Sequence, residues 1–121
     1  MKQELQNQLK EAFPQIFCDL RNCDHRKSLM CAGLEIGDGW YNLVYDMCDK
    51  IIKTNPNSEF KAVQVKQKFG GLRFYTTAAS DEVHKIIDEA EQLSYKICED
   101  CGSTENVESG WITLCKNCRR D

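Results

Sequence analysis

The sequence predicts an α+β fold that ends in a four-cysteine zinc ribbon. Apolar residues recur at helical spacing in three stretches, and one stretch between them alternates with period two around a pair of glycines. Two C-x-x-C pairs follow near the C-terminus. We therefore expect residues 1–97 to form a core in which two to three helices pack on a small antiparallel hairpin or sheet. Residues 98–121 are expected to form a zinc ribbon docked on the last helix.

The first half of the core is predicted to contain two helices. Residues 2–13 carry an amphipathic helical pattern that stops near Pro14. Residues 14–37 show no regular period, so we expect a loop with short local structure. Asp38 is a favourable N-cap for a second helix, whose apolar stripe begins at Trp40.

The second half is predicted to contain a β-hairpin and a third helix. Residues 60–78 alternate with period two, and Gly70-Gly71 supplies a two-residue turn that pairs Lys68 with Arg73. The predicted core side holds Val63, Val65, Phe69, Leu72 and Phe74, and the opposite side holds Lys66, Lys68, Arg73 and Tyr75. Ser80 is expected to cap the third helix.

The strongest chemical signal is the cysteine spacing near the C-terminus. The four ligands that it predicts are Cys98, Cys101, Cys115 and Cys118. Thirteen residues separate the two pairs, enough for a short hairpin that brings four thiolates to one Zn²⁺ ion. Gly102 follows the first pair, where a positive φ lets backbone N–H groups face the sulfurs. A four-thiolate shell has no open coordination position, so this zinc is expected to be structural.

The other cysteines carry a weaker signal. No apolar run reaches membrane-spanning length and the N-terminus lacks the apolar stretch of a signal peptide, so we expect a cytoplasmic chain, no membrane contact and reduced thiols. Cys48 falls on the stripe of the second helix and is expected to pack in the core. A second zinc site is an open alternative to packing for the N-terminal group Cys18, Cys23, His25 and Cys31.

The charges favour a protein partner over DNA at the ribbon. The formal net charge is −3, and four thiolates around one divalent cation make it about −5. The ribbon is acidic, which disfavours DNA binding through it. Candidate partner-binding positions are the acidic residues of the third helix, Asp81, Glu82, Asp88, Glu89 and Glu91. The basic face Lys66, Lys68, Arg73 and Tyr75 is either a ligand surface or a solvated one. Trp40 and Trp111 are expected to pack, or to anchor an interface where exposed.

Catalytic signatures are missing from the sequence. It has two histidines, His25 and His84, with no nucleophile pattern beside them, and no P-loop, dinucleotide or metalloprotease fingerprint. We therefore expect a protein that is not an enzyme.

Three motifs occur in a distinctive order: Gly37-Asp-Gly-Trp40, the hairpin from Val65 to Tyr75, and the terminal cysteine pairs. Over roughly residues 31–118 the chain resembles a family of small phage and prophage zinc-ribbon proteins. The resemblance implies the fold above and a phage origin. By analogy it also implies stoichiometric binding of a host protein, as in anti-CRISPR proteins that inhibit the type II CRISPR nuclease. The alternatives are a nucleotide- or nucleic-acid-binding module that uses the basic hairpin face, and a phage interaction adaptor.

Overall fold

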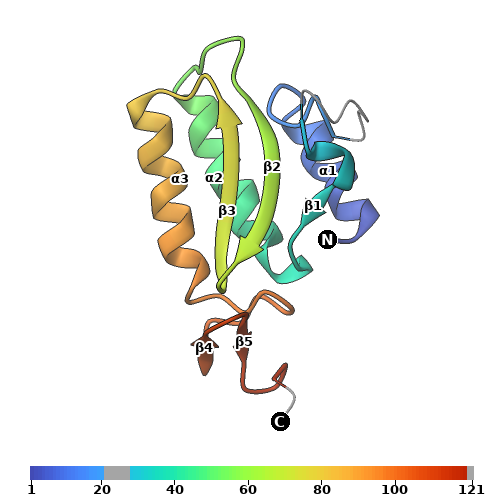
Figure 1. The fold of residues 1–121 in the computed structure, drawn as a ribbon, viewed down its shortest axis with the longest axis vertical. Helices are drawn as coiled ribbons and strands as arrows, with labels where there is room; N and C mark the ends of the chain where they lie inside the picture. Colours follow the sequence, from blue (N-terminus) through green and yellow to red (C-terminus); the bar gives the residue numbers. More distant parts are fainter. Residues whose placement is uncertain (21–27, 120–121) are drawn as a thin grey trace.

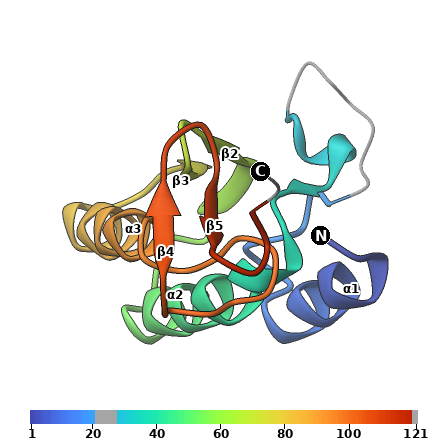
Figure 2. The ribbon, with the colours of Figure 1, turned by 90° about the horizontal axis from the view of Figure 1, so that it is seen from below.

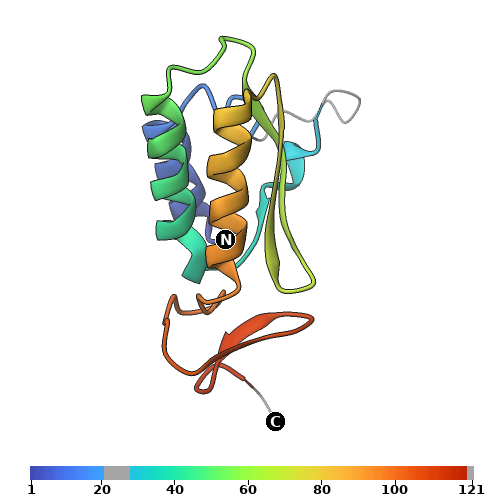
Figure 3. The ribbon, with the colours of Figure 1, turned by 90° about the vertical axis from the view of Figure 1, so that its left-hand side faces the viewer.

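A three-stranded sheet with helices on one face forms the larger part of the chain, and a two-stranded sheet follows it (Figures 1 and 3). This computed structural model describes residues 1–20 and 28–119. The helices are α1 (Gln3–Ala12), α2 (Tyr41–Lys53) and α3 (Asp81–Ser94), and the strands are β1 (Leu34–Glu35), β2 (Lys61–Lys68), β3 (Gly71–Thr77), β4 (Val107–Ser109) and β5 (Thr113–Cys115). Short 3-10 turns occupy Met30–Ala32 and Asp38–Trp40. The predicted α+β class is confirmed.

The core lies between the helices and the sheet. Its largest fully buried side chains include Leu9, Phe17, Trp40, Ile51, Phe60, Val65 and Leu72. Burying each such side chain contributes about 1.5–3 kcal/mol. The stripe predicted for the second helix is buried from Trp40 to Ile51, and the Cys48 thiol lies within it, but its last predicted member, Ile52, is exposed. Sequence analysis missed β1, which pairs in parallel with β2 through Leu34 and Val65.

The two later helices begin differently from each other. Ser80 caps α3 as predicted, because its Oγ accepts a hydrogen bond from the backbone N–H of Val83 at 3.2 Å. The predicted cap at Asp38 is wrong. Its carboxylate instead accepts the backbone N–H of Lys2 at 2.7 Å, and α2 begins after the 3-10 turn without a side-chain cap.

The hairpin has a different register from the predicted one. Lys68 pairs with Gly71, and the two loop residues are Phe69 and Gly70, with φ angles of 52° and 81°. A Cβ added to Gly71 would lie 2.4 Å from Tyr95 Oη, so this glycine is required by packing and not by the turn. Phe69 consequently sits in the loop, 53% exposed, and not in the core.

The faces of the hairpin are nevertheless as predicted, because Arg73 pairs with Lys66 and the change of register is an even number of residues. A β-bulge between Ala62 and Gln64 changes which residue is buried at one further position. Ala62 is buried there, whereas the predicted core residue Val63 is only half-buried.

Candidate metal centre

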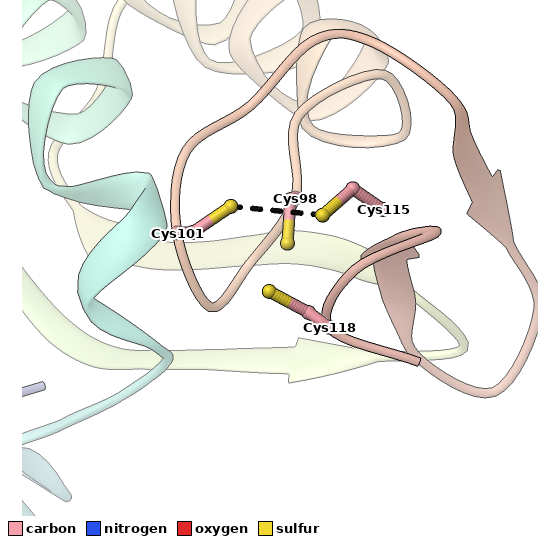
Figure 4. A group of neighbouring side chains, drawn as sticks. All are labelled: Cys98, Cys101, Cys115 and Cys118. Carbon is pink, nitrogen blue, oxygen red and sulfur yellow. Dashed lines mark hydrogen bonds between the residues drawn. The ribbon is translucent and has the colours of Figure 1, made fainter. Parts of the chain in front are cut away.

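Two turns at the C-terminal end bring four cysteine sulfurs together (Figure 4). Cys98 and Cys101 lie on the turn after α3, Cys115 ends β5, and Cys118 lies on the turn that follows. The four sulfur atoms lie within 4.8 Å of one another. This gathering is the arrangement that the spacing predicts, and it is zinc-ribbon-like.

The spacing of the sulfurs fits a tetrahedral metal site. The Sγ atoms of Cys101 and Cys115 are 3.7 Å apart. A tetrahedron with metal–sulfur bonds of about 2.3 Å has edges of about 3.8 Å, whereas a disulfide brings sulfurs to about 2.05 Å. The cluster can therefore take a metal ion with little rearrangement.

The backbone of the first turn is shaped around its sulfur. Gly102 has a φ of 83°, as predicted, and its N–H donates to the Cys98 carbonyl oxygen at 2.9 Å. Burial raises the pKa of Cys98, but hydrogen bonds from backbone N–H groups of Cys115, Cys101 and Asp100 outweigh burial and lower this pKa to about 6. The site thus favours a thiolate at its most enclosed sulfur.

The outer two sulfurs behave differently. The pKa of Cys118 is raised, first by hydrogen bonding with Cys115 and Cys101 and then by burial. The pKa of Cys101 is raised as well: a backbone hydrogen bond from Ser103 lowers it, but bonds to the neighbouring sulfurs outweigh that effect. A bound divalent cation would favour the thiolate form of these sulfurs, because metal binding displaces their protons.

The first cysteine turn is seated on the Gly37-Asp-Gly-Trp40 motif. The N–H groups of Gly37 and Gly39 donate to Glu99, to its Oε2 at 2.9 Å and its carbonyl oxygen at 2.8 Å. The indole N–H of Trp40 donates to the Ile97 carbonyl oxygen at 2.9 Å. This motif therefore positions the metal centre on the core. The local sequence pattern predicts only that the motif precedes a helix, and not this contact with the cysteine turn.

The hairpin tip is the second part of the core that is hydrogen-bonded to the ribbon. The hydroxyl of Thr113, which is fully buried, donates to the carbonyl oxygen of Gly70 at 2.6 Å and lies 2.8 Å from Ser109 Oγ. The backbone carbonyl oxygen of Thr113 accepts a hydrogen bond from the backbone N–H of Glu99 at 2.9 Å, which connects the first cysteine turn to the strand that leads into the second. Seen from below, β4 and β5 lie across the end of the core (Figure 2). The ribbon thus contacts the hairpin tip and the Gly37–Trp40 turn as well as the end of α3.

The N-terminal cysteines do not form a comparable cluster in the described residues. Cys31 is disulfide-bonded, which differs from the expected reduced state, and a disulfide sulfur is not a thiolate ligand. Cys18 is a free, exposed thiol. Cys23 and His25, the other members of the predicted second site, lie outside the described residues.

The basic hairpin face is more nearly neutral than its sequence indicates. Lys66, Lys68, Arg73 and Tyr75 do share one face, as the register requires. However, Arg73 Nη1 lies 2.9 Å from Glu91 Oε1, and Glu35 of β1 stands opposite Lys66. Both acidic residues come from other elements, so the hairpin sequence alone gave no sign of them.

Acidic and aromatic side chains are exposed elsewhere. Asp81, Glu82, Asp88 and Glu89 are exposed along α3, and within the described part of the chain none of them is in an ion pair. Trp40 is completely buried, whereas Trp111 is 77% exposed and packs against Phe69 with the ring centroids 5.1 Å apart and the ring planes tilted by 47°. By the reasoning from sequence, an exposed Trp111 is a candidate interface anchor.

Comparisons with protein-family models, with curated proteins and with solved structures found no match to this chain. The resemblance to phage proteins and the functions that it implies therefore stay predictions. Among the described residues, no helix has both the length and the apolar character needed to cross a membrane.

Proposed function

We propose that Cys98, Cys101, Cys115 and Cys118 hold one Zn²⁺ ion as a structural centre. The 3.7 Å sulfur separation supports a tetrahedral site, and thiolate ligands favour zinc among common divalent ions. Bound zinc would fix the two cysteine turns and would not react, because four protein ligands fill its shell. Metal analysis of purified protein should find one equivalent, and the cobalt-substituted protein should show a tetrahedral sulfur spectrum. Well under one equivalent, or a water ligand in that spectrum, would contradict the proposal.

The chain is proposed to act by stoichiometric binding and not by catalysis. Within residues 1–20 and 28–119, no Ser–His or Cys–His hydrogen bond is formed, and His84 is exposed on α3. Four exposed carboxylates along α3 carry the proposal, because a surface of this kind is complementary to a basic protein partner and accelerates its association. The exposed ring of Trp111 offers an apolar anchor at the ribbon end.

The proposed partner is a host defence protein with a basic surface. The resemblance to phage proteins points to a CRISPR effector nuclease, such as the type II enzyme, because its nucleic-acid channel is rich in Lys and Arg. Such a partner places the chain in the host cytoplasm. The Cys31 disulfide runs counter to this placement, since the cytoplasm keeps most cysteines reduced.

A pull-down against a panel of purified Cas effectors tests the partner. The doubly substituted Asp88→Lys, Glu89→Lys protein should lose the complex, and so should Trp111→Ala. The matched control is Glu4→Lys with Glu11→Lys on α1, which makes the same charge change at exposed positions on another helix. The absence of a complex with every effector would contradict the proposal, and equal loss in the control would contradict the role of α3.

The nucleic-acid alternative has weaker support. Its basic residues are close to carboxylates, with Arg73 paired to Glu91 and Lys66 opposite Glu35. Calorimetry with single-stranded nucleic acid and cyclic nucleotides should therefore give equal heats for the unmodified protein and the Lys68→Glu, Arg73→Glu variant. If the unmodified protein binds one of these ligands and the variant does not, nucleic-acid or nucleotide binding would become the favoured function and protein binding the alternative.

A further inference from the structure

A groove of about 490 Å³ runs between β3 and α3. One wall is made by four consecutive strand residues, 73–76. The other is made by His84, Ile87, Asp88 and Glu91 of α3. These four helix residues follow the spacing i, i+3, i+4 and i+7, so they form one stripe along the helix. The volume lies within the range of known ligand sites, and its shape is long because a strand and a helix line it.

The strand wall is the free edge of the sheet, whose strand order is β1-β2-β3 (Figure 1). In an antiparallel ladder, residues that exchange hydrogen bonds alternate with residues whose N–H and C=O face outward. The two-residue loop closes on the pair Lys68–Gly71, so Arg73 and Tyr75 bond to β2 and Phe74 faces outward.

The hydrogen bonds along this edge agree with that assignment. The N–H of Leu72, two residues before Phe74, donates to Ser94 Oγ of α3 at 2.9 Å. At Phe74 the helix no longer supplies a partner, and within the described residues neither its N–H nor its C=O forms a hydrogen bond outside the β2 ladder. The groove therefore opens where the strand edge still has backbone groups to offer.

The helix wall of the groove carries one acidic side chain that no described basic residue neutralises. Asp88 is exposed and is in no ion pair with another described residue, and Asp81 lies on the same stripe one turn before His84. At the hairpin end the Arg73–Glu91 ion pair is neutral, and Lys68, which also lines the groove there, adds a positive charge. Beside Asp88, phosphate groups would be repelled, whereas a lysine or arginine side chain would be attracted.

We propose that the groove binds an extended, basic peptide segment of a partner protein, which adds to the free edge of β3 as a fourth strand. Main-chain bonds to Phe74 hold the segment, and Asp88 selects Lys or Arg at the position of the segment that lies beside it. A segment that continues past the hairpin end meets the exposed Phe69–Trp111 ring pair. This inference rests on the proposed protein-binding function and names the chemistry of the bound segment.

A synthetic octapeptide of alternating valine and lysine is the probe, titrated into the ¹⁵N-labelled full chain. The Phe74 amide faces the groove, so its hydrogen exchange should slow at least tenfold when peptide saturates the protein. The Arg73 and Tyr75 amides bond to β2 and should change little. An absence of binding, or binding that leaves the Phe74 amide unprotected, overturns the proposal.

Charge variants test the basic specificity. Asp88→Lys should raise the Kd of the valine–lysine peptide about three- to tenfold. The control Glu11→Lys makes the same charge change at an exposed position of α1 that does not line the groove, and should stay within twofold. Equal effects of both variants, or equal binding of a valine–glutamate octapeptide or of an oligothymidine, overturn the proposal.

The peptide result and the pull-down result can fail separately. Protection of Phe74 by the peptide without any Cas complex would support the groove and contradict the proposed partner. A Cas complex that forms equally well with Asp88→Lys would support the proposed function and contradict the groove.

Discussion

Substituting Gly39 by alanine should disrupt the seat of the metal centre. A Cβ at this position would lie 2.2 Å from the Cys98 carbonyl oxygen and 2.5 Å from the Gly102 nitrogen. Both are backbone atoms, so no flexible side chain can move aside. The cysteine turn must shift as a whole, and the hydrogen bond from Gly39 N–H to the Glu99 carbonyl oxygen, 2.8 Å long, is then lost.

The expected cost combines overpacking and the lost hydrogen bond. Overpacking typically costs 1–3 kcal/mol and a lost hydrogen bond about 1 kcal/mol, so the free energy of unfolding of Gly39→Ala should fall by about 2–4 kcal/mol. For a chain of this length each kcal/mol lowers Tm by roughly 4 °C, which gives a drop of roughly 8–16 °C. The same shift moves the Cys98 turn, so the zinc affinity should fall at least about tenfold, which corresponds to 1.4 kcal/mol.

Thermal unfolding followed by circular dichroism, together with a chelator competition for zinc, measures both effects. The matched control is Gly110→Ala, because nothing lies within 4 Å of a Cβ added there. Its free energy of unfolding should stay within about 0.5 kcal/mol of the unmodified protein. If Gly39→Ala and Gly110→Ala show the same Tm and the same zinc affinity, the first cysteine turn is not seated on Gly39 as described.

Three further predictions concern the cysteines and the hairpin joint. Cys101→Ser should release the metal and unfold the ribbon, since metal binding supplies on the order of ten kcal/mol in small zinc folds; one retained equivalent of zinc would refute this. Thr113→Val removes the donor to the buried Gly70 carbonyl oxygen and should cost about 1–3 kcal/mol in chemical denaturation, whereas unchanged stability would show that the joint is weak. Burial raises the pKa of the Cys48 thiol, so alkylation followed by mass spectrometry should label exposed Cys18 first and Cys48 only on unfolding; equal labelling would contradict the burial.

The hairpin shows what local pattern predicts and what it misses. Alternation identified both strands and the correct faces, because the side-chain period is two. The turn was predicted one residue too late because both adjacent glycines were assigned to the two-residue loop. In the structure only Gly70 is in the loop, and Gly71 is required by packing. Gly71 is needed for the close approach of Tyr95, whereas Phe69 tolerates the positive φ of the loop. Tyr95 belongs to a segment more than twenty residues away, so no local rule could have included it.

The charge of the hairpin face likewise depends on residues that are distant in the sequence. The hairpin carries basic residues without an acidic neighbour in sequence, and the prediction of a basic face followed from that. In the folded chain α3 brings Glu91 to Arg73, and β1 brings Glu35 to the register position opposite Lys66. The four sulfur ligands, by contrast, were predictable because their geometry depends on two short turns and one hairpin, all encoded within about twenty residues.

The three motifs that suggested a phage family converge on one structural joint. Gly37 and Gly39 hold Glu99 of the first cysteine turn, and Gly70 at the hairpin tip accepts the hydroxyl of Thr113 beside the second. The glycines of these motifs are explained by the close approach of backbone segments, and the cysteines by the spacing that a metal ion needs. Their contacts specify how the ribbon is attached, and none of these contacts involves the exposed carboxylates of α3 on which the proposed partner would dock. The groove between β3 and α3 lies half outside them, since its helix wall belongs to none of the three. Proteins that share the motifs should therefore share the fold and the metal site, and the groove proposal adds that the sequence of the α3 stripe would set which segment each one binds.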